Sequence, residues 1–143
     1  MNRFLIVLLV QCTGCFTVNS SGLAHRNVSP EQAKAIIDLN DGVVVVDVRE
    51  ADEYCSAGGH IRGALNYPWT SGVFKARFEE LRPDNHILLV CRSGNRSSQA
   101  AMFLDSKGFS LVSEMVGGMR AWQWETVGCI DSDSDGINDD LDN

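Results

Sequence analysis

Residues 87–97 read Ile87-Leu88-Leu89-Val90-Cys91-Arg92-Ser93-Gly94-Asn95-Arg96-Ser97, and they carry the clearest signal of the fold. Its first four residues form an uninterrupted apolar run, which is typical of a strand buried on both faces of a parallel sheet. The polar residues after the run indicate a short loop, and the apolar residues from position 100 onward recur at helical spacing. The stretch therefore predicts a strand, a loop that begins with a cysteine, and a helix from about Ser97 to Gly108.

Further strand and helix signals alternate on both sides of this stretch. Ser29, Pro30 and Gln32 form a helix start, with a capping box and a proline at the first helical position. Strands are expected at residues 43–46, 64–66 and 111–113, and further helices at residues 51–55, 73–81 and 119–122. This alternation predicts an α/β sandwich with a mostly parallel sheet. Sites in such sheets form beyond the carboxyl ends of the strands, where residues 47–49 and 91–96 are both expected.

The loop that begins at Cys91 has the composition of an anion-binding site. A helix N-terminus offers unpaired N–H groups and a partial positive charge, and Gly94 lets successive N–H groups point inward. Arg92 and Arg96 add fixed positive charge. These features favour the thiolate, the reactive form of cysteine, over the thiol. They therefore indicate that Cys91 is a functional residue and not a small inert residue of the core. The spacing from Cys91 to Arg96 is Cys-x4-Arg. Cysteine phosphatases use Cys-x5-Arg and would need an arginine at position 97, which is Ser97 here. The shorter loop should enclose one sulfur atom better than a tetrahedral phosphate.

The N-terminus has the pattern of an export signal. Arg3 provides a short positive region, and the apolar run from Phe4 to Val10 is too short to span a bilayer. We expect residues 1–24 to be a signal peptide removed after Ala24, which places the mature protein in the periplasm or outside the cell. Two alternatives stay open: residues 12–15 form a degenerate lipobox that would lipidate Cys15 and anchor the chain to a membrane, or the N-terminus is retained. N-terminal sequencing of the mature protein distinguishes the three.

Charge and cysteine content limit the possible functions further. Six aspartates lie in the last thirteen positions, and without them the formal net charge of −7 falls to −1. The body is therefore almost neutral and lacks the clustered Lys and Arg of nucleic-acid-binding proteins. Of the five cysteines, Cys55, Cys91 and Cys129 lie beyond the predicted signal. An odd number in an oxidising compartment predicts one disulfide and one free thiol.

Four separated motifs together resemble the rhodanese homology family. The resemblance covers about residues 27–126, and it implies a three-layer α/β domain, here residues 25–128, with a central, mostly parallel sheet of about five strands. The motifs are Val45-Val46-Asp47-Val48-Arg49-Glu50, Gly59-His60-Ile61-Arg62-Gly63-Ala64-Leu65-Asn66, Cys91-Arg92-Ser93-Gly94-Asn95-Arg96-Ser97 and Gly117-Gly118-Met119-Arg120-Ala121-Trp122.

The resemblance implies a sulfurtransferase with Cys91 as the nucleophile. Cys91 would take the outer sulfur of a donor such as thiosulfate, form a persulfide, and pass the sulfur to cyanide or a thiol. Substrate would be bound by the loop residues Arg92, Ser93, Gly94, Asn95 and Arg96, with Arg92 on the donor and Arg96 holding the loop. No metal or organic cofactor is implied for catalysis. The alternatives are a non-catalytic rhodanese module for sulfur carriage or protein interaction, and a phosphatase or arsenate reductase, which the loop length disfavours. The sequence does not indicate an oligomeric state.

Other residues of the motifs have expected structural roles. Asp47 and Arg49 are expected to pair with each other or to brace loops. In the family, the motif that contains His60 supports the edge of the active site, so we expect support from His60 rather than general-base catalysis. Trp122 and Trp124 are expected to close the core rather than to line a binding site.

One departure from the family pattern involves a cysteine. The family commonly has two residues between Glu-Tyr and Gly-His, whereas four residues separate Glu53-Tyr54 from Gly59-His60 here. The insertion contains Cys55, and Cys129 lies just past the last expected helix. These positions predict a Cys55–Cys129 disulfide that attaches the C-terminal segment to the domain and leaves Cys91 free.

The C-terminal segment, residues 129–143, resembles a thrombospondin type 3 calcium repeat. Counted from Asp131, side chains at positions 1, 3 and 5, a glycine at 6, a backbone carbonyl at 7 and a carboxylate at 12 match a calcium loop. The expected ligands are Asp131, Asp133, Asp135, Ile137, Asp139 and Asp142. A solvated acidic tail is the alternative. Isothermal titration is expected to show binding heat at millimolar calcium, and the absence of heat would contradict the prediction.

Overall fold

The computed structural model describes residues 25–129. The predicted signal peptide at residues 1–24 and the predicted calcium ligands lie outside the described residues. Within the described range, no helix combines the length and the apolar character needed to cross a membrane. The elements are β1 (Arg26–Val28), α1 (Pro30–Leu39), β2 (Val44–Asp47), α2 (Ala51–Tyr54), β3 (Leu65–Asn66), α3 (Val73–Arg77), the 3-10 helix η1 (Phe78–Glu80), β4 (Ile87–Val90), α4 (Asn95–Ser106), β5 (Val112–Met115) and the 3-10 helix η2 (Gly118–Arg120).

A single five-stranded sheet forms the centre of the molecule. Its strand order is β1-β5-β4-β2-β3, and every neighbouring pair is parallel. The order places β4, the strand that leads into Cys91, in the middle of the sheet. The α/β fold with a parallel sheet of about five strands, expected from the sequence, is confirmed.

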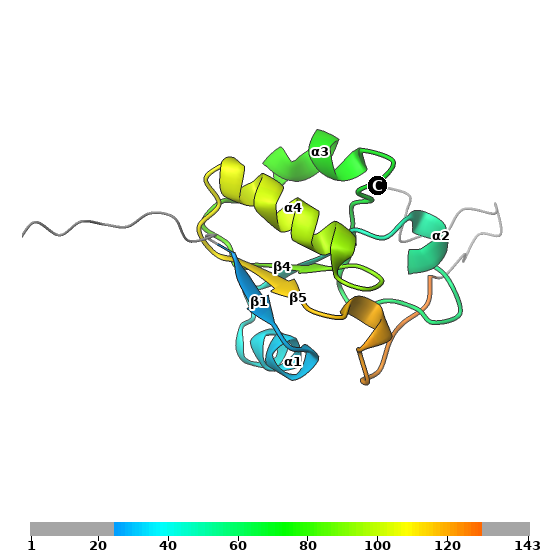
Figure 1. Ribbon diagram of the computed structural model, residues 1–143. Helices are drawn as coiled ribbons and strands as arrows, with labels where there is room; N and C mark the ends of the chain where they lie inside the picture. Colours follow the sequence, from blue (N-terminus) through cyan, green and yellow to red (C-terminus); the bar gives the residue numbers. More distant parts are fainter. Residues whose placement is uncertain (1–24, 130–143) are drawn as a thin grey trace, which may run out of the picture.

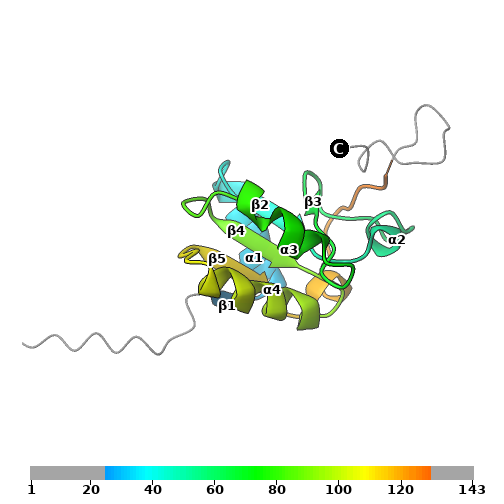
Figure 2. The same ribbon diagram turned by 90° about the horizontal axis from the view of Figure 1, so that it is seen from above.

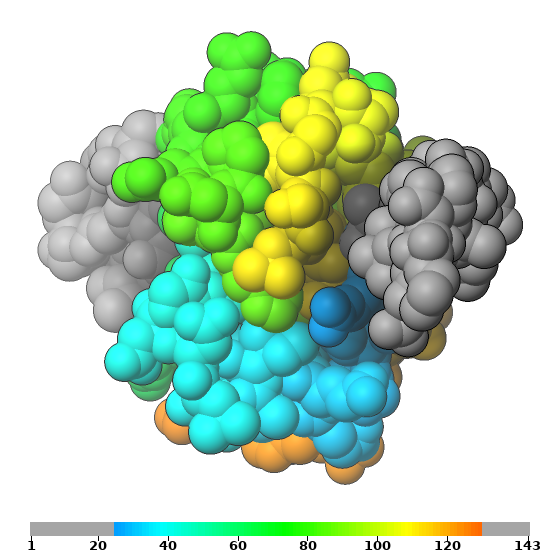
Figure 3. Space-filling model, turned by 90° about the vertical axis from the view of Figure 1, so that its left-hand side faces the viewer, coloured from blue at the N-terminus to red at the C-terminus, as the bar shows by residue number. Residues whose placement is uncertain are grey.

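Helices cover both faces of this sheet. Helices α3 and α4 lie on one face and α1 on the other (Figures 1 and 2). Figure 3 views the molecule from the amino ends of the strands, with the segments around α3 and α4 in green and yellow and the segment around α1 in blue and cyan. Alternate residues of β4 belong to separate core clusters, with Ile87 and Leu89 on the α4 side and Leu88 and Val90 on the α1 side. This two-sided burial explains the apolar run in the sequence.

The structure adds a strand that the sequence did not predict. Strand β1 has three residues, of which Arg26 and Asn27 are exposed and only Val28 is buried. It lies at the edge of the sheet and pairs with β5, with Val28 opposite Met115. A strand this short and this exposed has no apolar run or alternation, so its pairing is determined by tertiary contact and not by local pattern.

Several predicted elements have different bounds or types. Strand β5 ends at Met115 and not at residue 113, so Glu114 is part of the sheet. The helix predicted at 73–81 divides into α3 and η1, and the predicted final helix is a single 3-10 turn, η2. Gly117 and Gly118, the cap and the first residue of η2, have φ values of 80° and 58°. A left-handed residue inside the turn departs from α-helical geometry, which is consistent with a single 3-10 turn here.

A disulfide and a short β-bridge attach the C-terminal segment to the domain. Cys55, at the end of α2, is bonded to Cys129, the pair that the sequence predicts, and their Cα atoms are 5.1 Å apart. Nearby, His60 and Val127 exchange two backbone hydrogen bonds of 2.9 Å. The segment after η2 is therefore joined to the loop after α2.

Removing the disulfide is expected to destabilise the domain. The bond closes a sequence separation of 74 residues, so the variant Cys55→Ser/Cys129→Ser should lose about 4 kcal/mol of unfolding free energy. Urea denaturation of oxidised wild type and variant measures the difference, and reduced wild type is the control that should match the variant. Equal stability of the variant and the oxidised wild type would contradict the prediction.

Candidate active site

The carboxyl ends of β2 and β4 place two polar segments next to each other. Asp47 is opposite Val90 in the parallel register, and the Val48 N–H donates to the Val90 carbonyl at 2.9 Å. Residues 47–49 and the loop from Cys91 to Arg96 therefore lie side by side, as expected for the carboxyl ends of parallel strands.

Cys91 is the free cysteine of the described chain, and its side chain is buried. It follows β4 directly, and its sulfur receives hydrogen bonds from the loop and from α4. The Gly94 N–H lies 3.1 Å from Cys91 Sγ, and the Ser97 hydroxyl lies 3.3 Å from it. Gly94 caps α4 with a φ of 102°, a left-handed conformation that glycine adopts without strain. The loop thus curls around the sulfur.

The surroundings of Cys91 stabilise its ionised form. Burial raises the pKa of the thiol, but hydrogen bonds from the Ser97 hydroxyl and from the N–H groups of Ser97, Ser93 and Gly94 outweigh it, so the pKa lies below its usual value. These donors lie in the loop and in the first turn of α4, where the helix dipole adds positive potential. The site therefore favours a buried thiolate, which is a nucleophile.

The segment from Gly117 to Arg120 fixes the backbone of this loop. The Met119 N–H donates to the Cys91 carbonyl at 2.7 Å, and the Arg120 N–H donates to the Arg92 carbonyl at 3.1 Å. A Cβ at Gly118 would collide with the Cys91 carbonyl oxygen and with the Ser93 nitrogen. Glycine at 118 is therefore required for the close approach of the two segments, which explains this part of the Gly-Gly motif.

Arg96 attaches the loop to α2. Its guanidinium donates two hydrogen bonds to the Glu53 carboxylate, at 2.6 and 2.8 Å. The side-chain hydrogen bond from Arg96 holds the pKa of Glu53 below its usual value, although burial acts in the opposite direction. Arg96 thus holds the loop, as expected, through a partner that no local sequence pattern indicates.

Asp47 and Arg49 pair with each other beneath the site. Arg49 Nη2 and Nε lie 2.7 and 2.9 Å from Asp47 Oδ2, and both side chains are buried. Arg49 also donates to the backbone carbonyls of Glu53 and Gly59, at 3.1 and 2.9 Å. The pair therefore connects the end of β2 to the loop after α2, which is the structural role expected for it.

His60 belongs to the supporting edge. Its ring stacks on Tyr54 with centroids 3.6 Å apart, Nδ1 lies 3.3 Å from the Tyr54 carbonyl oxygen, and the residue is buried. Its backbone forms the bridge to Val127. These contacts match the supporting role expected from the sequence.

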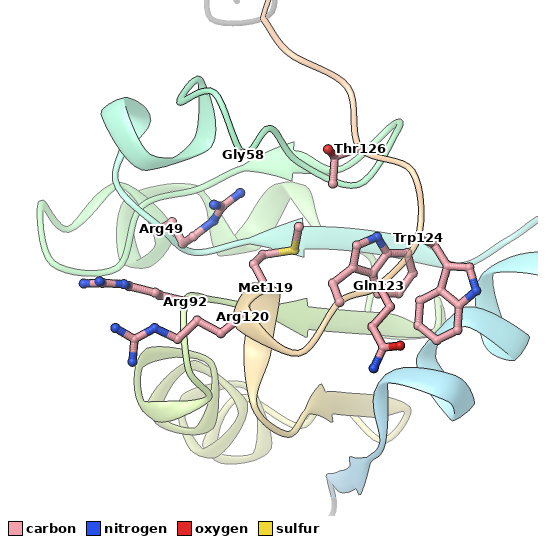
Figure 4. Close-up of a pocket in the computed structure, with 9 residues that line it drawn as sticks. Arg49, Gly58, Arg92, Met119, Arg120, Gln123, Trp124 and Thr126 are labelled. Atoms are coloured by element: carbon pink, nitrogen blue, oxygen red, sulfur yellow. The ribbon is translucent and has the colours of Figure 1, made fainter.

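A pocket of about 370 Å³ opens beside the loop (Figure 4). Two positively charged side chains of its wall, Arg92 and Arg120, are exposed and form no ion pair with another described residue.

Trp122 and Trp124, with ring centroids 4.8 Å apart, also line the pocket. Trp122 packs against the core, as expected, but both indoles also line the pocket, which was not expected. The lining residues are Arg49, Gly58, Arg92, Met119, Arg120, Trp122, Gln123, Trp124 and Thr126.

Three residues near the site were not assigned from the sequence. Glu53 is the partner of Arg96, Glu114 accepts a hydrogen bond from Ser97 at 2.7 Å, and Arg120 lies in the pocket wall. Arg120 belongs to the Gly117–Trp122 motif and follows the glycines that approach the loop. This position in a family motif could have indicated that it lies near the site. Glu53 and Glu114 are 38 and 23 positions from Cys91 in the sequence, and no local pattern indicates their contacts with the loop.

The fold and the site together define a rhodanese-like protein. Residues 29–125 match the rhodanese-like domain family, and the chain belongs to that family. The thiosulfate sulfurtransferase GlpE of Pseudomonas entomophila is 40% identical over 98 residues, which cover 68% of this chain and 84% of GlpE. YrkF of Bacillus subtilis, named as a candidate sulfur carrier protein, is 36% identical over 99 residues, 69% of this chain. This chain spans about half, 51%, of YrkF.

Solved structures of the family share the fold. A rhodanese-related protein from Thermoplasma volcanium has a TM-score of 0.59 and 27% identity, covering 68% of this chain and 89% of that one. A rhodanese-like domain from an Anabaena protein has a TM-score of 0.62 and 27% identity, covering 79% and 86%. The parallel sheet and its helices are thus those of rhodanese-like domains.

Proposed function

We propose that this chain is a sulfurtransferase that moves sulfane sulfur from a donor such as thiosulfate to cyanide or a thiol. The observation that carries the proposal is the buried Cys91 sulfur, which accepts hydrogen bonds from Gly94 and Ser97 and has a pKa below its usual value. The likeness to GlpE enzymes, which are named thiosulfate sulfurtransferases, supports the same activity.

In the first half-reaction the Cys91 thiolate attacks the outer sulfur of thiosulfate. A new S–S bond forms to Cys91, the S–S bond of thiosulfate breaks, and its electron pair leaves with sulfite. The negative charge moves from Sγ to the outer sulfur of a Cys91 persulfide. Loop N–H groups between Arg92 and Arg96 would hold this charge, in the manner of an oxyanion hole.

In the second half-reaction an acceptor attacks the outer sulfur of the persulfide. The bond between the two sulfurs breaks, and its electron pair returns to Cys91 as the thiolate. The acceptor leaves as thiocyanate or as a persulfide. Covalent catalysis of this kind predicts ping-pong kinetics, and it requires no metal or organic cofactor.

The charges around the pocket suit an anionic donor. The guanidinium of Arg49 is already paired with Asp47, whereas Arg92 and Arg120 keep their positive charge for an incoming anion. Their position next to the loop supports a role in binding thiosulfate, with Arg92 as the sequence suggested and Arg120 as an addition.

A non-catalytic sulfur carrier is the second candidate function. Cys91 is only 1% exposed, and burial of this kind would protect a persulfide until a partner protein arrives. The likeness to YrkF favours the same alternative. A carrier would accept sulfur on Cys91 but would not turn over with a small acceptor.

Export and calcium binding stay predictions. Both rest on residues outside the described range, namely 1–24 and 131–142. The Cys55–Cys129 disulfide supports an oxidising compartment, because such bonds are rare in the reducing cytosol.

Thiosulfate is expected to add the mass of one sulfur atom to the wild-type chain and none to Cys91→Ser. With cyanide present, the wild type should form thiocyanate continuously. The variants Arg92→Ala and Arg120→Ala should each lose roughly tenfold in kcat/KM for thiosulfate, because each removes about one charge-assisted contact. Mass spectrometry and a thiosulfate:cyanide assay measure these effects.

Arg82→Ala is the matched control. Arg82 precedes the amino end of β4, whereas the site lies at its carboxyl end, so this variant should leave kcat/KM unchanged. Sulfur loading without thiocyanate formation would favour the carrier over the enzyme. A wild type that never gains sulfur would contradict both functions.

A further inference from the structure

Glu114 is a buried carboxyl group directly beneath the Cys91 loop. It lies in β5, is only 3% exposed, and stands next to Leu89 of β4 in the sheet register. Its Oε1 accepts a hydrogen bond of 2.7 Å from the Ser97 hydroxyl. Because the sulfur-transfer chemistry proposed above uses no buried carboxyl group, the position of Glu114 needs its own explanation.

The Ser97 hydroxyl connects Glu114 to Cys91. It lies 2.7 Å from Glu114 Oε1, 3.1 Å from the Gly94 carbonyl oxygen and 3.3 Å from Cys91 Sγ. A hydroxyl has one hydrogen to donate, so it can serve only one of these acceptors well at a time. If Glu114 is ionised, its carboxylate takes that hydrogen. If Glu114 is protonated, it can donate to Ser97 Oγ, and the Ser97 hydrogen is then available to the sulfur.

Two negative charges on this bridge would be costly. Cys91, Ser97 and Glu114 are all buried, and two like charges joined by one hydroxyl repel each other strongly at low dielectric. Burial raises the pKa of Glu114, although the hydrogen bond from Ser97 and the nearby His25 act in the opposite direction, whereas the pKa of Cys91 is lowered. The two shifts bring the pKa values of the carboxyl and the thiol closer together, which favours sharing one proton over binding two or none.

The other titratable groups around Glu114 leave this balance in place. His25, just before β1, interacts electrostatically with Glu114 and acts to lower its pKa. Its Nδ1 lies 2.6 Å from Asp105 Oδ2 of α4. The Asp105 carboxylate therefore offsets part of the influence of this imidazole on Glu114. From the loop, Cys91 and the Ser97 hydroxyl face Glu114 directly.

We propose that Glu114 is a positioning residue for the Cys91 thiolate, and that the two groups share one proton through Ser97. When the thiol ionises, the proton on Sγ passes to Ser97 Oγ while the Ser97 proton passes to Glu114 Oε1. The O–H bond on Glu114 replaces the S–H bond on Cys91, and the total charge stays at one negative. Ser97 then donates to the thiolate and accepts from Glu114.

This arrangement gives the buried thiol an internal acceptor for its proton. It also sets an upper pH limit for the stabilised thiolate, because ionisation of Glu114 returns the Ser97 hydrogen to the carboxylate and places a second negative charge nearby. The consequence for sulfur transfer rests on the proposed function, whereas the shared proton itself does not.

Carbon-13 NMR of carboxyl-labelled glutamate in the full-length protein tests the coupling. The Glu114 resonance is assigned by its disappearance in Glu114→Gln. In wild type it should titrate above the usual range of glutamate, and in Cys91→Ala its pKa should fall by about one pKa unit or more, because the neighbouring thiolate is gone. Cys91→Ser, which keeps a neutral group of similar shape, should lower the pKa as well and provides a second variant if the alanine variant fails to fold.

Ser113→Ala is the matched control. Ser113 precedes Glu114 in β5, but its Oγ lies 2.8 Å from His86 Nε2 and, among the described residues, forms no hydrogen bond with the Cys91 loop, so the pKa of Glu114 should not change. An unchanged pKa of Glu114 in both Cys91 variants, or a wild-type pKa in the usual range, would overturn the proposal. The titration needs no sulfur donor, so a wild type that never forms a persulfide would contradict the proposed function without affecting this result.

Discussion

Cys91 Sγ is almost completely shielded from water, and burial alone would keep it a neutral thiol. The Gly94 N–H and the Ser97 hydroxyl reverse this preference, because they donate to the sulfur from the first turn of α4. The fold supplies these donors at the edge where parallel strands end, next to the N-terminus of a helix that covers the sheet (Figure 1). Both the nucleophilic thiolate and a persulfide anion require that this site stabilises a negative charge on sulfur away from water.

The contacts that surround the loop keep those donors in place. Gly118 lets η2 approach closely enough for Met119 to bind the Cys91 carbonyl, and Arg96 attaches the other end of the loop to Glu53. The Asp47–Arg49 pair joins the same end of α2 to β2. Two segments that are distant from the loop in sequence, η2 and α2, thus hold it directly, and the Asp47–Arg49 pair ties α2 to the sheet.

Local signals in the sequence were sufficient for the centre of this arrangement. The apolar run of β4, the cysteine and the glycine of the loop and the helix after them are contiguous, so their relation could be predicted. The partners of the loop could not, because the Arg96–Glu53 and Ser97–Glu114 contacts depend on packing between distant segments. Strand β1 has no apolar pattern, and Trp122 and Trp124 were assigned to the core because composition does not show which way an indole turns.

The pH at which Cys91 ionises is the property on which its reactivity as a nucleophile depends. The rate at which iodoacetamide alkylates Cys91 in the folded protein, followed as a function of pH, reports the fraction of thiolate. We expect a midpoint below the value of about 8.5 for an unperturbed cysteine, and a higher midpoint in Ser97→Ala, which lacks one donor to the sulfur. A wild-type midpoint at or above about 8.5 would show that the loop does not stabilise the thiolate.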